Sequence, residues 1–372
     1  MKNKIGIYIH VPFCAGKCAY CDFVSFVKDA ETQDRYFAML KKEIGTKADK
    51  FKDYVVDTVF FGGGTPSLVS EKNITGIMEL LRDRFSFSED PEITIEANPN
   101  SGDINKFRAY REAGINRLSM GLQSSVDSEL KDLSRLHTYD EFLKCFDAGR
   151  NAGFDNMNLD IMSAIPGQSI SSYEKTLERV VRLDPEHISA YSLIIEEGTP
   201  FFERYKDGRG LPTEEEDRKM YALTREFLSD YGYSRYEISN YSKAGFECRH
   251  NLSYWKRIPY VGFGIAAASL YDEKRYIKHS DLERYLKGDF SEEEEILTPT
   301  DRMEEFMFLG LRLTEGVSKE EFYKTFGSSI EEEYPGVLEK LSGRGLLKVT
   351  DRVSLTEKGM DLANYCMSEF IK

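Results

Sequence analysis

Hydrophobic and polar residues follow two different periods along the first half of the chain. Six short, nearly continuous apolar runs, typical of strands buried on both faces, alternate with longer stretches whose apolar residues recur every three or four positions. The runs are Ile5–His10, Val55–Phe61, Glu92–Ala97, Arg117–Gly121, Met157–Met162 and His187–Ile195. The intervening stretches, expected to be helices, are Thr32–Lys47, Glu71–Phe85, Ile104–Ala113, Tyr139–Ala152 and Ser171–Leu183. One strand and one helix every 30 residues or so, roughly the length of a βαβ unit, predict a parallel α/β sheet.

Six such units are too few to close an eight-stranded barrel. We therefore expect an open, partial (β/α)6 barrel over residues 1–200. Ligands bind in sheets of this kind beyond the carboxyl ends of the strands. Polar residues that follow the predicted strands are thus the first candidates for a functional site.

The pattern changes after residue 200, where we expect residues 201–290 to flank the barrel and Ser291–Glu295 to form a solvated linker. From Pro299 the order is helix, helix, helix, a two-stranded wing and a last helix. This predicts a C-terminal α+β extension, residues 296–372, that resembles a winged helix. Its Asp and Glu residues outnumber its Lys and Arg residues, so a DNA-reading role is not expected.

The charge and composition of the chain limit the cellular locations and the classes of binding partner that we expect. The formal net charge of −14 argues against general binding to nucleic acids or anionic membranes, although local peripheral contact with a membrane stays open. Apolar runs all fall short of the roughly 20 residues that a transmembrane helix needs. The N-terminal residues do not have the pattern of a signal peptide. We therefore expect a cytosolic protein whose six cysteines are thiols.

Three of these cysteines lie close together, directly after the first predicted strand: Cys14, Cys18 and Cys21. Three thiolates on one short loop can hold three corners of a [4Fe–4S] cluster and leave the fourth iron open to a chelating ligand. A zinc site is the alternative, but structural zinc usually takes a second Cys-x-x-Cys pair, which this sequence lacks. The remaining cysteines are expected to be small buried hydrophobes: Cys145, Cys248 and Cys366.

The segment from Tyr8 to Phe23, with its Cys14-Ala-Gly-Lys-Cys18-Ala-Tyr-Cys21 core, resembles the cluster motif of the radical S-adenosylmethionine (SAM) superfamily. From residue 5 to its end the chain is similar to one branch of that superfamily, the oxygen-independent coproporphyrinogen III oxidases. The resemblance implies a [4Fe–4S] cluster on the three cysteines and SAM on the open iron. It also implies SAM contacts from the glycine run after the second strand, from later strand ends and from two tyrosines. These residues are Gly63, Gly64, Thr65, Glu96, Gln123, Arg135, Asp160, Tyr8 and Tyr20.

Physical reasons support the expected SAM-contact residues, although each residue type could also have a purely structural role. Bare backbone N–H groups of the glycine run could take the carboxylate and amino end of SAM, although a tight turn would also need glycine. The charged residues share the strand-end location where ligands bind, although any of them could instead belong to an ion pair.

Two functions from different classes fit the resemblance. One is an oxidase in porphyrin biosynthesis that decarboxylates coproporphyrinogen; the other is a heme chaperone that binds heme and delivers it to client proteins. The oxidase has a fourth cysteine two residues after the third, where this chain has Phe23, and a longer extension ahead of the cluster loop. The segment His250-Asn-Leu-Ser-Tyr254-Trp255 matches a motif typical of the heme-chaperone branch. The sequence therefore favours the chaperone over the enzyme, and we assign no catalytic residue.

His250 is our candidate for a heme ligand. An imidazole beside large aromatic side chains suits both axial ligation of iron and stacking on a porphyrin. The alternative is a structural histidine that holds the junction between domains. The other four histidines are expected to be structural: His10, His137, His187 and His279. His10 lies near the expected cluster and could in addition donate a hydrogen bond to a residue that holds it.

Overall fold

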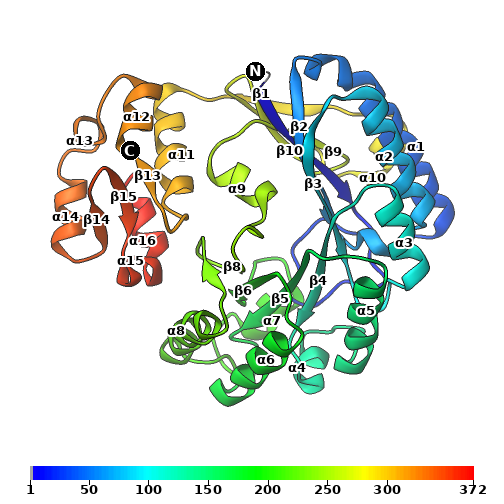
Figure 1. Cartoon of the computed structure of the whole chain (residues 1–372), viewed down its shortest axis with the longest axis horizontal. Coiled ribbons are helices and arrows are strands. Elements are labelled where there is room, and N and C mark those ends of the chain that lie inside the picture. The colour runs from blue at the N-terminus through cyan, green and yellow to red at the C-terminus, as the bar shows by residue number, and fades with distance from the viewer. Residues whose placement is uncertain (1–2) are drawn as a thin grey trace.

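A twisted sheet with six parallel strands forms the centre of the molecule. The computed structural model describes residues 3–372 (Figure 1). The parallel strands lie side by side in chain order, which confirms the partial barrel. They are β1 (Asn3–Val11), β2 (Tyr54–Gly63), β3 (Phe87–Ala97), β4 (Arg117–Gln123), β5 (Met157–Ser163) and β6 (His187–Ser192).

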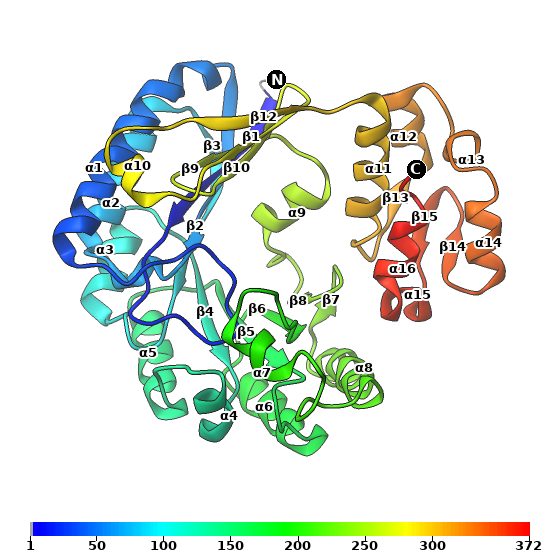
Figure 2. The same ribbon diagram turned by 180° about the vertical axis from the view of Figure 1, so that it is seen from behind.

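Helices cover the outer face of this sheet, as Figures 1 and 2 show. They form because their apolar residues fall on one face; α6, for example, buries Tyr173, Leu177 and Val180 against the barrel. These helices are α1 (Ala30–Lys47), α2 (Glu71–Arg84), α3 (Ile104–Glu112), α4 (Asp127–Asp132), α5 (Tyr139–Asn151), α6 (Ile170–Arg182) and α8 (Glu214–Asp230). Helix α7 (Pro200–Tyr205) lies apart from them, against the loop that follows β1. Two short 3₁₀ helices are η1 (Ala48–Phe51) and η2 (Pro66–Leu68).

The segment after α8 extends the sheet at both edges. Two short antiparallel strands follow β6, and four strands continue from β1, which gives the order β12-β11-β10-β9-β1-β2-β3-β4-β5-β6-β8-β7. The sheet therefore runs across residue 200, where we expect the boundary between the barrel and its flanking part. The added elements are β7 (Ser234–Arg235), β8 (Asn240–Ser242), α9 (Arg249–Trp255), β9 (Tyr260–Phe263), β10 (Ala268–Tyr271), β11 (Lys274–Lys278), α10 (Leu282–Leu286) and β12 (Glu292–Ile296).

The expected linker at Ser291–Glu295 is wrong, because most of it belongs to the edge strand β12. Its run of glutamates pairs with a lysine-bearing neighbour: Lys274 lies opposite Ile296 and bonds Glu294, and Lys278 lies opposite Glu292. Strand propensity alone disfavours four consecutive glutamates. Cross-strand charge pairs with β11 offset that preference.

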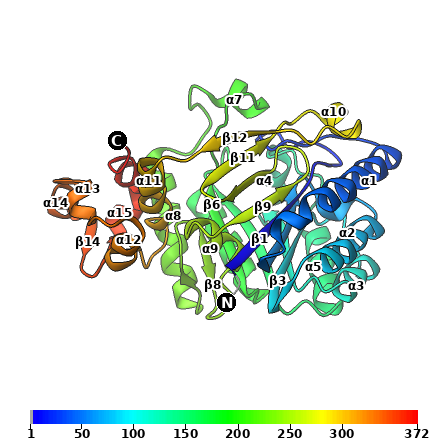
Figure 3. The same cartoon turned by 90° about the horizontal axis from the view of Figure 1, so that it is seen from above.

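The C-terminal residues form a separate small unit with its own core, beside α8 and α9 and away from α1 and α2 (Figure 3). Its sheet has the order β13-β15-β14. The third of the three helices predicted before the wing is divided in two, α13 and α14, around Gly336, which has a φ of 78°. The predicted hairpin is present, and the resemblance to a winged helix stays a prediction. The elements are α11 (Pro299–Gly310), β13 (Val317–Ser318), α12 (Lys319–Phe326), α13 (Ile330–Glu333), α14 (Val337–Gly343), β14 (Leu347–Val349), β15 (Arg352–Leu355), α15 (Glu357–Asp361) and α16 (Ala363–Ser368).

A buried ion pair fastens α1 to the added strands. Lys278 on β11 lies 3.1 Å from Glu43 on α1, and the two side chains are 2% and 0% exposed. Glu43 also accepts hydrogen bonds from the Gly264 amide at 2.9 Å and from the Tyr285 hydroxyl at 2.6 Å. Burial lowers the pKa of Lys278. The pair therefore depends on both partners staying in place.

We predict that Lys278→Met lowers the free energy of unfolding by about 3 kcal/mol, because it leaves a buried carboxylate without its cation. The effect falls at the lower end of the usual range because Lys47, 3.9 Å from Glu43, remains. Lys274→Met on the same strand is the matched control and costs at most about 1 kcal/mol, since its pair with Glu294 is partly exposed. Urea unfolding of both variants is the measurement. Equal losses would show that the buried pair does not hold the added strands.

Candidate functional site

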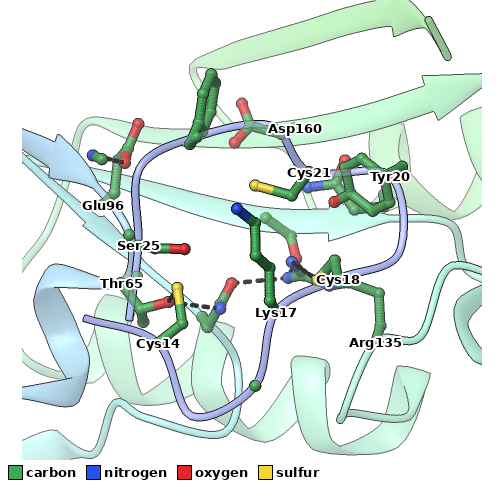
Figure 4. Close-up of a pocket in the computed structure, with 18 of the residues that line it drawn as sticks. Cys14, Lys17, Cys18, Tyr20, Cys21, Ser25, Thr65, Glu96, Arg135 and Asp160 are labelled. Carbon is green, nitrogen blue, oxygen red and sulfur yellow. Dashed lines mark hydrogen bonds between the residues drawn. The ribbon is translucent and has the colours of Figure 1, made fainter. Parts of the chain in front are cut away.

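A cavity opens at the carboxyl ends of the barrel strands, beneath the loop that follows β1 (Figure 4). All three clustered cysteines line it. So do most of the predicted SAM-contact residues, which come from five different strands or the segments after them. The residues brought together are Cys14, Cys18, Tyr20, Cys21, Gly63, Gly64, Thr65, Glu96, Gln123, Arg135 and Asp160. Tyr8 and His250 are not among the lining residues.

The cysteine loop is held by backbone hydrogen bonds on both sides. The Cys14 amide donates to Phe26 O at 3.0 Å, and the Phe26 amide donates to Pro12 O at 2.8 Å, so the loop closes on itself. Across from it, the Gly64 amide donates to Val11 O at 2.9 Å and the Thr65 amide to Phe13 O at 2.7 Å. These bonds fix the loop against the end of β2.

The amides of the glycine run have partners within the protein, and SAM contact by Gly63, Gly64 and Thr65 stays a prediction. The Gly63 amide donates to Glu96 at 3.2 Å, and the amides of Gly64 and Thr65 bond the cysteine loop, so none of the three is free for SAM. A side chain at Gly64 would come within 2.8 Å of the Phe13 backbone nitrogen. Gly64 is glycine because two backbone segments meet there.

The donor set fits an iron–sulfur cubane. All three cysteines are free thiols that are partly exposed to the cavity. In residues 3–372, no three His, Cys, Asp or Glu side chains converge closely enough to hold a single metal ion. A cubane needs no such convergence, because each thiolate binds a different iron. Cys14, Cys18 and Cys21 would hold the cluster, which would offer an open iron to SAM.

Two buried carboxylates, Glu96 on β3 and Asp160 on β5, line the cavity across from the cysteine loop. Burial, followed by the charge of Asp160, raises the pKa of Glu96 to about 8. Burial also raises the pKa of Asp160, which accepts a hydrogen bond from Asn158 at 2.7 Å. Two buried acids that repel each other favour a cation between them or a shared proton. The amino group and sulfonium of SAM are both cationic, so the electrostatics suit this ligand.

Polar side chains on the opposite wall hold one another. Arg135 donates to Gly121 O at 2.6 Å and to Asn98 Oδ1 at 2.7 Å, and Gln123 accepts a bond from the Tyr191 hydroxyl at 2.9 Å. Tyr20 packs on Phe201 and lies close to Arg135. These arrangements keep the arginine pointing into the cavity.

Tyr8 lies beneath the cavity instead of in its wall. Its hydroxyl bonds His10 Nδ1 at 3.0 Å, and His10 Nε2 bonds Val24 O at 3.0 Å. Because a carbonyl can only accept, the His10 Nε2 carries the proton and Tyr8 donates to Nδ1. The pair ties β1 to the far side of the cysteine loop.

His250 is on α9, a helix that lies between the sheet and the C-terminal unit (Figure 1). Its side chain is 1% exposed, and both ring nitrogens are bonded: Nδ1 to the Thr58 hydroxyl at 2.8 Å and Nε2 to the Tyr254 hydroxyl at 2.9 Å. It stacks on Phe60 with 5.1 Å between ring centres. In this arrangement neither nitrogen is free for iron, so heme ligation by His250 stays a prediction that requires Tyr254 to move.

Sequence reasoning missed three residues of the barrel interior: Asn98, Arg117 and Tyr191. Arg117 is 2% exposed, and among the described residues its buried Nε has no hydrogen-bond partner. Strand alternation carried the signal, because Arg117, Ser119, Gly121 and Gln123 occupy every second position of β4 and thus share one face.

Comparisons with known proteins agree with this site. Residues 8–180 match the family model of the radical SAM superfamily, and residues 297–362 match that of the HemN C-terminal domain. The chain is 36% identical to the heme chaperone HemW of Bacillus subtilis and 31% identical to HemW of Escherichia coli. The first alignment covers 98% of both chains; the second covers 99% of this chain and 98% of the relative. A solved structure of E. coli coproporphyrinogen III oxidase (HemN), 22% identical, covers 99% of this chain and 90% of its own with a TM-score of 0.87.

The barrel and the three-cysteine loop define a radical SAM protein. Within that superfamily, identity above 30% over nearly the whole length decides the branch. The chain belongs to the HemW heme chaperone family. The likeness to the oxidase shows that the fold is shared.

We predict that replacing Cys14, Cys18 or Cys21 singly by Ala abolishes the brown chromophore after anaerobic reconstitution, because each thiolate anchors one iron. Cys145→Ala, Cys248→Ala and Cys366→Ala are matched controls that keep it, since these thiols are buried elsewhere. Iron and sulfide analysis is the measurement. Four irons per chain in Cys14→Ala would contradict the assignment.

A second prediction concerns the pH dependence of the empty pocket. The folded chain binds a proton on Glu96 up to about pH 8, whereas a glutamate in the unfolded chain releases it near the ordinary pKa of 4.5. The stability that this proton contributes is therefore complete below pH 4.5 and lost as the pH rises through about 8. Glu96→Gln should remove this part of the pH dependence in unfolding experiments without cofactor.

The same variant should bind SAM about ten- to a hundred-fold more weakly, because the cationic end of SAM displaces the Glu96 proton and pairs with a carboxylate that glutamine cannot supply. Calorimetry on the cluster-loaded protein measures this change. Unchanged SAM affinity in Glu96→Gln would remove Glu96 from the cofactor site.

Proposed function

We propose that this chain is a heme chaperone that carries a [4Fe–4S] cluster, SAM and one heme and delivers the heme to client proteins. The observation that carries the proposal is the identity to HemW chaperones over nearly the whole chain. Free thiols suit a reducing compartment, and we place this activity in the cytosol. Within the described residues, helices of the length and apolar character needed to span a membrane are absent.

The cluster loop supports a carrier over an oxidase. Phe23 occupies the position where the oxidase has its fourth cysteine, and its ring is 62% exposed at the edge of the cavity. An exposed aromatic ring supplies a stacking surface and cannot hold iron. The loop thus offers an apolar face beside the cluster.

The region around the His250 motif also suits a porphyrin. Trp255 lines a cavity between α9 and the C-terminal unit whose walls combine apolar side chains with cations. Apolar walls fit the macrocycle. The cations pair with Glu315 or Glu305 in this structure and would have to exchange these partners for the propionates. The apolar residues are Phe306, Leu313 and Val317, and the cations are Lys256, Arg257 and Arg352.

His250 remains the candidate axial ligand. Burial, and after it the charge of Arg117, lowers its pKa to about 3, so the imidazole is neutral at physiological pH. Neutral imidazole is the form that ligates iron. Release of the Tyr254 hydroxyl would free Nε2 for that bond.

The test is a heme titration run beside a decarboxylation assay. We expect one heme per chain and carbon dioxide release from coproporphyrinogen III no higher than in a control without protein. His250→Ala should shift the Soret band and weaken heme retention, and Trp255→Ala should cost less because it removes only stacking. His279→Ala, a half-buried histidine that bonds Asp289 O, is the control that keeps heme.

Tyr254→Phe separates a ligand from a structural histidine. If Nε2 binds iron, removing the hydroxyl that occupies it should leave heme affinity equal or higher. A normal heme spectrum in His250→Ala would move the ligand elsewhere and leave the chaperone intact. Cluster- and SAM-dependent carbon dioxide release would overturn the chaperone and favour the oxidase.

A further inference from the structure

One amide side chain connects hydrogen-bond donors that reach two of the three cluster cysteines. We propose that Asn98 is a positioning residue for the cluster, which orients Thr65 toward Cys14 and Arg135 toward Cys18 and thereby raises the reduction potential. This inference concerns the cluster alone and does not depend on heme.

Asn98 follows β3 directly and bonds both neighbours. Its Nδ2 donates to Thr65 Oγ1 at 2.9 Å, and its Oδ1 accepts from Arg135 Nη2 at 2.7 Å, the two bonds dashed between Thr65 and Arg135 in Figure 4. A guanidinium can only donate, so the amide oxygen must face Arg135. The amide nitrogen then necessarily faces Thr65, and the orientation of Asn98 is determined by chemistry.

The direction of the next bond follows from this orientation. Because the Thr65 oxygen accepts from Asn98, its own proton is free to point to the Cys14 sulfur, 3.6 Å away. A cluster-bound thiolate has no proton and can only accept. Thr65 is 4% exposed, so water does not compete readily for this proton. Asn98 therefore makes Thr65 a donor to Cys14.

The other end of the amide fixes Arg135. Its Nη2 bonds Asn98 and the Gly121 carbonyl, which holds the guanidinium plane and directs Nη1 to the Cys18 sulfur at 3.8 Å. Cys21 is different, because its thiol receives a backbone hydrogen bond from Phe23. The hydrogen-bond donors to Cys14 and Cys18 thus depend on Asn98, and the donor to Cys21 belongs to the main chain.

Hydrogen bonds to cluster sulfurs raise the reduction potential, because they stabilise the more negative reduced state. Asn98→Ala removes the support of both donors. Asn98→Asp keeps the arginine bond but cannot donate, so the Thr65 proton turns to the new carboxylate and leaves Cys14. The carboxylate also adds negative charge near the cluster, which lowers the potential further.

The experiment is a redox titration of anaerobically reconstituted protein without SAM or heme, followed by absorption and electron paramagnetic resonance. We expect Asn98→Ala and Thr65→Val to favour the oxidised cluster about tenfold, or about 59 mV for a one-electron couple. Thr65→Ser keeps the hydroxyl and should stay near the wild-type potential. Thr94→Val is the matched control, a buried threonine on β3 that lies outside the network.

Wild-type potentials in Asn98→Ala and Asn98→Asp with four irons bound would overturn the proposal. If Asn98→Ala does not retain its irons, the Thr65 pair decides: equal potentials in Thr65→Val and Thr65→Ser overturn it, and a lower potential in Thr65→Val alone supports it. Iron analysis separates these outcomes from a failure of the cluster assignment itself.

Discussion

The close approach of two backbone segments at Gly64 sets the geometry of the whole pocket. The amides of Gly64 and Thr65 bond the carbonyls of Val11 and Phe13, so the end of β2 and the start of the cysteine loop lie in direct contact. A Cβ at Gly64 would overlap this backbone. Cys14 follows Phe13 at once, and the Thr65 hydroxyl lies 3.6 Å from its sulfur because of the same contact. The metal site is thus positioned by main-chain hydrogen bonds before any side chain contributes.

Charge in the barrel interior is arranged around this fixed loop. Glu96 and Asp160 are two acids whose burial disfavours ionisation, and the buried guanidinium of Arg117 acts on Asp160 in the opposite direction. The interior therefore keeps carboxylates that are ready to receive a cation instead of pairing them fully within the protein. Full internal ion pairs would stabilise the empty fold but would leave less attraction for a charged ligand.

Much of this could be predicted from the sequence, because local signals carried it. Period and run length predicted the six parallel strands, and the spacing of Cys14, Cys18 and Cys21 predicted that the three cysteines share one pocket. Contacts between residues far apart in the sequence could not be predicted. The glutamates of β12 form a strand only because Lys274 and Lys278 lie opposite them. Asn98 connects Thr65 and Arg135 only because the fold brings these two residues to it. The hydrogen-bond partners of the Gly63–Thr65 amides could not be predicted for the same reason, since a glycine run does not show which backbone segment will approach it.

Strand β2 connects the two regions that a chaperone of this kind would use, the pocket of the cysteine loop and the His250 motif. Its last residue, Gly63, and the next two, Gly64 and Thr65, line the cavity beside the cysteine loop. Its earlier residues Thr58 and Phe60 contact His250. Parallel pairing on both sides, with β1 and β3, holds this strand rigidly. Because Thr58 and Phe60 occupy the same face as Gly62, a displacement of the His250 ring would press on the strand that supports the cysteine loop. The His250 segment and the cysteine loop are therefore parts of one packed unit, and each constrains the position of the other.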